Sequence, residues 1–135
     1  AMTSNLTLLQ KIQEDKNPWT INSLAEVAGA YMFHDQEYIN RTRDLISSER
    51  KRIYEELKTW KHVKVYEPHA NFILVRILNE GVTSYDVFVH CIKRGLMLRD
   101  CSTFPGLEDE TFFRFCFMMP EKNTELLECL REILE

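Results

Sequence analysis

Two arginines are the residues whose type and placing most suggest chemistry. Arg114 stands inside the apolar run "FFRFCF", and Arg99 stands in the segment "LRDCSTFPGL". A guanidinium that is withdrawn from water needs a matched anion or a full set of acceptors. Its planar fork suits a carboxylate or a phosphate, which it can bind through two parallel hydrogen bonds. Both arginines are therefore candidates for anion binding. The alternative is a structural ion pair with a nearby acid such as Asp100 or Glu108.

The other reactive side chains form no recognisable site. The histidines lack the spacing of metal ligands, and the cysteines contain no C-x-x-C pair, so neither a zinc site nor a redox dithiol is indicated. Free thiols are the expectation. Cys101 lies close to Arg99, and a neighbouring cation favours the thiolate, so a lowered pKa is one interpretation of this thiol, and an inert thiol is the favoured one. No histidine base for it is evident, and we predict no catalytic residue and no metal ligand in the chain.

Composition limits the class of protein. The chain has 135 residues, a formal net charge of −4 and 44% hydrophobic residues, which fits one globular domain over residues 1–135. A surface that binds nucleic acid would show a basic excess, so no nucleic-acid partner is expected. No apolar stretch reaches the roughly 20 residues of a membrane span, and no signal peptide is evident. We therefore expect a cytoplasmic protein without a membrane partner. Ala1 and Met2 resemble a cloning remnant and a start methionine.

Hydrophobic periodicity predicts the elements that must position the arginines. Helices are expected over residues 4–14, from about residue 20 through "NSLAEVAGAYMF", over 35–59, over 83–94 with Thr83 as N-cap, and from Pro120 onward. Strands are expected over 63–67, 70–78, "LMLRDC" and "FFRFCFM". This order predicts an α/β fold: a small two-layer sandwich with a mostly antiparallel sheet of three or four strands and helices on one face. Alternation in the last strand places Arg114 on the face opposite Phe113 and Phe115.

Five segments carry a resemblance to a known family. They are "NPWTINSLAEVAG", "EYINRTRDLISSER", "PHANFILVR", "RGLMLRDCSTFPGL" and "RFCFMMPEKNTELLECL". In this order and spacing they resemble the C-terminal small domain of the class I/II (fold type I) aminotransferases, which use pyridoxal phosphate. They are most similar to the branch of histidinol-phosphate aminotransferase and threonine-phosphate decarboxylase. The resemblance covers about residues 5 to 135.

The resemblance implies roles for three residues. It implies that Arg114 binds the α-carboxylate of the substrate, that Arg99 faces an anionic group of the substrate, and that Asn71 of "ANF" lies beside the active site. "RDCSTFPGL" is closer to the decarboxylase, and Met118 and Met119 replace the small-residue segment typical of the aminotransferase. Transaminase and decarboxylase therefore both stay open.

The resemblance also implies what the chain lacks. The family's Schiff-base lysine and its other cofactor-binding residues belong to a large domain that precedes this part, so this chain carries the substrate-clamping half of a site. The implied cofactor is pyridoxal phosphate in a full-length parent, with none expected on this chain, which is not expected to be active alone. The implied partners are an amino-acid substrate with an anionic group and the large domain, in a parent that forms a homodimer. The alternative is a free-standing, non-catalytic module that binds a small anion or a protein partner.

Overall fold

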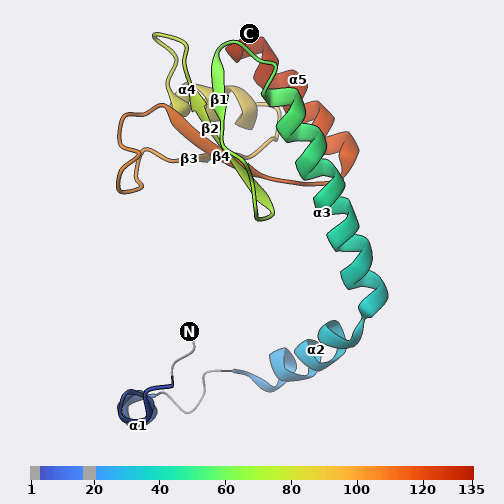
Figure 1. The fold of residues 1–135 in the computed structure, drawn as a ribbon, viewed down its shortest axis with the longest axis vertical. Helices are drawn as coiled ribbons and strands as arrows, with labels where there is room; N and C mark the ends of the chain where they lie inside the picture. The colour runs from blue at the N-terminus through green and yellow to red at the C-terminus, as the bar shows by residue number, and fades with distance from the viewer. Residues whose placement is uncertain (1–3, 17–20) are drawn as a thin grey trace. The chain divides into compact units, whose positions relative to one another are not determined.

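The computed structural model describes residues 4–16 and 21–135 of the chain (Figure 1). By its internal contacts the chain divides into two compact units, Ala1–Ile39 and Asn40–Glu135. The expected remnant at residues 1–2 and the expected helix start near residue 20 lie outside the described residues. One domain over residues 1–135 stays a prediction.

Within its described residues, the first unit wholly contains the helices α1 (Leu6–Asp15) and α2 (Ser23–His34). Each begins at an asparagine N-cap whose side-chain oxygen accepts a hydrogen bond from a backbone N–H three residues on, Asn5 for α1 and Asn22 for α2. Neither helix has a buried residue. Apolar side chains of α2 are exposed instead, including Leu24 at 83% and Phe33 at 79% of their surface.

The second unit is built on a four-stranded antiparallel sheet in the order β1-β2-β4-β3. The strands are β1 (Val63–Val65), β2 (Phe72–Ile77), β3 (Arg99–Asp100) and β4 (Phe112–Cys116). The predicted antiparallel sheet is confirmed, but the predicted strand "LMLRDC" was too long. The N–H of Leu96 donates to the carbonyl of Cys91 (3.1 Å), so this part of the segment closes the preceding helix instead of joining the sheet.

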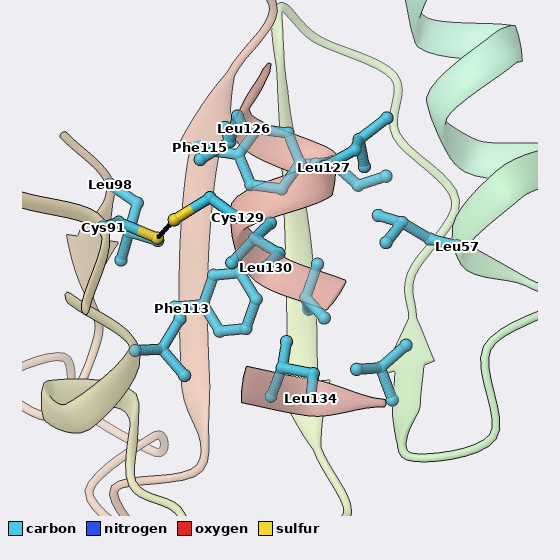
Figure 2. Close-up of a cluster of buried hydrophobic side chains, with 14 of the residues drawn as sticks. Leu57, Cys91, Leu98, Phe113, Phe115, Leu126, Leu127, Cys129, Leu130 and Leu134 are labelled. Carbon is cyan, nitrogen blue, oxygen red and sulfur yellow. Dashed lines mark hydrogen bonds between the residues drawn. The ribbon is translucent and has the colours of Figure 1, made fainter. Parts of the chain in front are cut away.

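Three helices pack on one face of this sheet: α3 (Gln36–Leu57), α4 (Ser84–Ile92) and α5 (Pro120–Leu134). As predicted, Thr83 caps α4, in a capping box with Asp86, and Pro120 opens α5. Figure 2 shows Phe113 and Phe115 of β4 in a cluster with leucines of α5 and with Leu57 of α3. The predicted two-layer sandwich is therefore confirmed.

The opposite face of the sheet carries the candidate chemistry. Partners in an antiparallel register share a face, so the pairs Phe72–Cys116, Leu74–Arg114 and Arg76–Phe112 all project away from the helices. We call these six side chains the open face. The sequence pattern had placed Arg114 opposite Phe113 and Phe115, and the strand register agrees.

Candidate functional site

The sheet register brings Arg99 and Arg114 together. The two residues are direct partners across β3 and β4, so both side chains leave the sheet on the open face. The Cβ atoms of such partners lie about 5 Å apart, and like charges placed so are destabilising unless something compensates. Arg99 is exposed and Arg114 is half-buried. The pair therefore concentrates two positive charges at one place on the sheet.

Aromatic rings, rather than carboxylates, surround the two guanidiniums. The guanidinium carbon of Arg114 lies 5.0 Å from the ring centroid of Phe72 and 5.3 Å from that of Phe104. The guanidinium carbon of Arg99 lies 5.4 Å from the centroid of the same Phe104 ring. All three distances are within cation–π range. Arg99 also donates one hydrogen bond to the hydroxyl of Thr103, at 3.4 Å.

The structural ion pairs considered from the sequence are not formed. Among residues 4–16 and 21–135, no salt bridge within 4.0 Å involves Arg99 or Arg114. Asp100 instead accepts hydrogen bonds from Ser84 Oγ (2.7 Å) and from the N–H and hydroxyl of Ser102 (2.9 Å each). Burial opposes the shift, but these bonds, with a smaller contribution from the nearby charge of Arg99, lower the pKa of Asp100. Both guanidiniums therefore keep donors available for an anion.

A hollow of about 580 Å³ adjoins the arginines. Arg99 and Arg114 line it, and apolar side chains form much of the remaining wall, including Tyr85, Phe88, Met97 and Met118. The volume lies within the range of small-molecule sites, which commonly combine an apolar lining with a few placed polar groups.

Asn71, the third predicted site residue, does not line this hollow. It is exposed and immediately precedes β2, and its backbone carbonyl accepts a hydrogen bond from the N–H of Phe117 at 3.0 Å. It is not among the residues that line the hollow beside the arginines. The structure thus brings together two of the three predicted residues, and a role for Asn71 stays a prediction.

Cys101 is not activated by its neighbouring arginines. Its thiol is fully buried and donates to the carbonyl of Arg99, with 3.6 Å between sulfur and oxygen. Burial raises its pKa, and this effect outweighs the opposing charges of Arg114 and Arg99. All four cysteines are free thiols, including Cys91 and Cys129, whose sulfurs lie 3.6 Å apart in the core (Figure 2).

A buried polar network that the sequence did not reveal fixes the end of β4. The Asn123 amide accepts a hydrogen bond from the N–H of Met118 (2.9 Å) and donates to the Met118 carbonyl (2.8 Å) and to Glu49 (2.7 Å). Arg52 completes the network by donating twice to Glu49, at 3.0 and 2.7 Å. Asn123 is fully buried. The network ties the segment just beyond Arg114 to α3 and α5.

The residues beside the arginines do not suit covalent attachment of pyridoxal phosphate. That attachment needs a lysine amine, and every lysine of the chain is exposed. None of them lines the hollow. Within the described residues, no group of three or more His, Cys, Asp or Glu side chains is placed to hold a metal ion.

Comparison with known proteins first defines the fold. No family model matches the chain. The crystal structure of histidinol-phosphate aminotransferase from Clostridium acetobutylicum matches with a TM-score of 0.85 and 36% identity, over 97% of this chain and 39% of that one. The chain therefore has the fold of part of an aminotransferase.

Sequence comparison then identifies the part. A protein of Caldanaerobacter subterraneus subsp. tengcongensis, whose name places it with the threonine-phosphate decarboxylases, is 36% identical over 96% of this chain and 34% of its own length. Threonine-phosphate decarboxylase of Salmonella typhimurium is 26% identical over 98% of this chain and 35% of its own length. The chain thus spans about a third of these relatives. It matches the C-terminal part of the histidinol-phosphate aminotransferases and threonine-phosphate decarboxylases.

Within the parts of the chain that the structure describes, no helix has the length and apolar character needed to cross a bilayer.

Proposed function

We propose that this chain is the substrate-binding part of a pyridoxal-phosphate-dependent aminotransferase or decarboxylase, and that Arg114 and Arg99 each hold one anionic group of an amino-acid substrate. The observation that carries the proposal is the pairing of two guanidiniums on one face of the sheet, with no carboxylate partner among the described residues. Such a pair is most stable when a ligand supplies the negative charge.

Arg114 is proposed to bind the α-carboxylate and Arg99 a distal phosphate or carboxylate. Arg114 is half-buried and contacts two aromatic rings, which restricts the motion of its side chain. A residue that orients every substrate needs such a fixed position. Arg99 is exposed, at the edge of the sheet, and suits a group that varies between substrates. When bound in the whole enzyme, pyridoxal phosphate would supply the electron sink for the reaction.

The proposed partner is a large cofactor-binding domain, in a parent that forms a homodimer. The relatives have about two-thirds of their length outside the match. The exposed apolar side chains of α1 and α2 are the kind of surface that a further domain covers.

Reconstitution tests the proposal. In one chimera the chain replaces the matching C-terminal part of the Salmonella enzyme, and in a second chimera that of the Caldanaerobacter protein. The two unmodified proteins are the controls. We expect at least one chimera to release carbon dioxide from L-threonine O-phosphate. If both chimeras fold and bind the cofactor but release none, the decarboxylase assignment is wrong. Histidinol phosphate then tests the aminotransferase branch.

The chain alone is expected to self-associate, because α1 and α2 expose apolar side chains with no buried residue in either helix. Sedimentation velocity at several concentrations measures this. We expect the mean mass to rise with concentration. A chain that stays monomeric throughout would contradict the inference that this surface normally has a partner.

A further inference from the structure

The two guanidiniums of the site repel each other, yet the backbone holds them as direct partners. No carboxylate among the described residues forms a salt bridge with either arginine, so no ion pair orders the two guanidiniums before a ligand arrives. The described residues offer one ring that contacts both. The Phe104 centroid lies 5.4 Å from the guanidinium carbon of Arg99 and 5.3 Å from that of Arg114.

The connection between β3 and β4 delivers this ring to the arginines. The N–H of Phe104 donates to the carbonyl of Cys101 at 2.9 Å, and the N–H of Leu107 donates to the carbonyl of Phe104, also at 2.9 Å. Asp100 fixes the start of the same turn through Ser102. The turn is therefore hydrogen-bonded on both sides of Phe104, which fixes the backbone that carries the ring.

We propose that Phe104 is a positioning residue of the anion site, whose ring holds the guanidiniums of Arg99 and Arg114 side by side so that both can meet one ligand bearing carboxylate or phosphate. This inference rests on the proposed function, because it assigns a purpose to the same two arginines. The ring face attracts each cation and offsets their mutual repulsion, and ordering the two side chains in advance reduces the entropy lost on binding.

Phe72 provides a matched control. Its ring lies 5.0 Å from the guanidinium carbon of Arg114, and no contact of it with Arg99 is found within the described part of the chain. A leucine at either position removes the ring and keeps an apolar side chain. Phe104→Leu therefore removes contacts to both arginines, whereas Phe72→Leu removes a contact to Arg114 alone.

The experiment follows the side-chain Nε–Hε NMR signals of Arg99 and Arg114 in the 135-residue chain. Signals are recorded without ligand and during titration with inorganic phosphate and with L-threonine O-phosphate. The variants are Phe104→Leu, Phe104→Tyr and Phe72→Leu. Backbone amide signals of the core verify that each variant folds.

Without ligand, Phe104→Leu is expected to shift both arginine signals through loss of the ring current, and Phe72→Leu to shift that of Arg114 alone. In the titration, each lost ring contact should weaken binding about 2- to 5-fold, so Phe104→Leu, which loses two contacts, should weaken it about 4- to 25-fold and Phe72→Leu about 2- to 5-fold. Phe104→Tyr keeps the ring and should bind as the unmodified chain does.

Three results would overturn the assignment of Phe104. They are unchanged arginine signals in Phe104→Leu, phosphate binding by that variant as tight as in the unmodified chain, and a tyrosine variant that binds as weakly as the leucine variant. If phosphate instead leaves both arginine signals of the unmodified chain unmoved, the proposed function fails. The comparison without ligand still decides whether Phe104 positions the arginines.

Discussion

Replacing Arg114 by lysine in an active chimera is expected to lower kcat/KM about 30- to 150-fold. Lysine keeps the charge but loses the planar fork, so the bidentate hold on the α-carboxylate is lost. A charge-assisted hydrogen bond at the reacting centre contributes about 2 to 3 kcal/mol, which gives this range. Carbon dioxide release from L-threonine O-phosphate measures the effect. Because every amino acid has the α-carboxylate, L-threonine should also bind more weakly, and its competitive inhibition constant should rise.

Arg99→Lys in the same chimera is the comparison that separates the two roles. Its penalty should fall on L-threonine O-phosphate and leave the affinity for L-threonine almost unchanged, because only the phosphate ester carries the proposed partner of Arg99. Equal penalties for both ligands would mean that Arg99 is structural. Normal kinetics for Arg114→Lys would remove the proposed carboxylate clamp.

Replacing Asn123 by leucine is expected to lower the free energy of unfolding by about 3 kcal/mol. The change leaves the N–H and carbonyl of Met118 and one oxygen of Glu49 without the hydrogen bonds that Asn123 supplies. A polar group that loses its partner costs about 1 to 3 kcal/mol when it is fully buried. Three groups at the low end of that range give this figure, because Met118 is only half-buried and Glu49 keeps its hydrogen bonds from Arg52. Urea unfolding measures the change.

The neighbouring variant Thr124→Ala is the control for Asn123→Leu. Thr124 is exposed, and its one side-chain hydrogen bond among residues 4–16 and 21–135 goes to the carbonyl of Pro120 in the same helix, so its loss should cost about 0.5 kcal/mol or less. A cost for Asn123→Leu no larger than that of the control would contradict the network.

The same network predicts how stability depends on acid. The hydrogen bond from Arg52, reinforced by that from Asn123, lowers the pKa of Glu49 below its ordinary value of 4.5 although burial opposes the shift. A carboxyl whose pKa is lowered by folding contributes stability above its unfolded pKa and loses it as the pH falls through the folded value. The stability difference between the unmodified chain and Glu49→Gln should therefore be largest near neutral pH and shrink below about pH 4. A difference independent of pH would contradict this.

Local sequence signals predicted most of the fold. The capping box at Thr83, the proline that opens α5 and the alternation of β4 depend on residues close in the chain, and the structure has all three. The predicted strand "LMLRDC" was too long because the N–H of Leu96 donates to Cys91 at the end of α4, a competing hydrogen bond that strand propensity does not show; only Arg99–Asp100 joins the sheet. The register of β3 on β4 was also beyond prediction, because it depends on how the connection between the strands folds.

The candidate site was predictable in its charges but not in its surroundings. Arg114 was predicted as an anion-binding residue because it is a charge within an apolar run, and the family resemblance added roles for Arg99 and Asn71. No sequence pattern predicted a role for Phe104, because its contacts with the two arginines depend on how the turn between β3 and β4 folds. The contact of Asn123 with Glu49 joins residues 74 apart, which no periodicity reports.

The most direct test of the central claim is a crystal structure of an active chimera with bound L-threonine O-phosphate. The proposed function predicts that two guanidinium nitrogens of Arg114 each lie about 2.7 to 2.9 Å from one oxygen of the substrate carboxylate. It also predicts that the guanidinium of Arg99 donates hydrogen bonds to the phosphate. A ligand whose carboxylate and phosphate are both held by residues of the host, with neither arginine in contact, would contradict it.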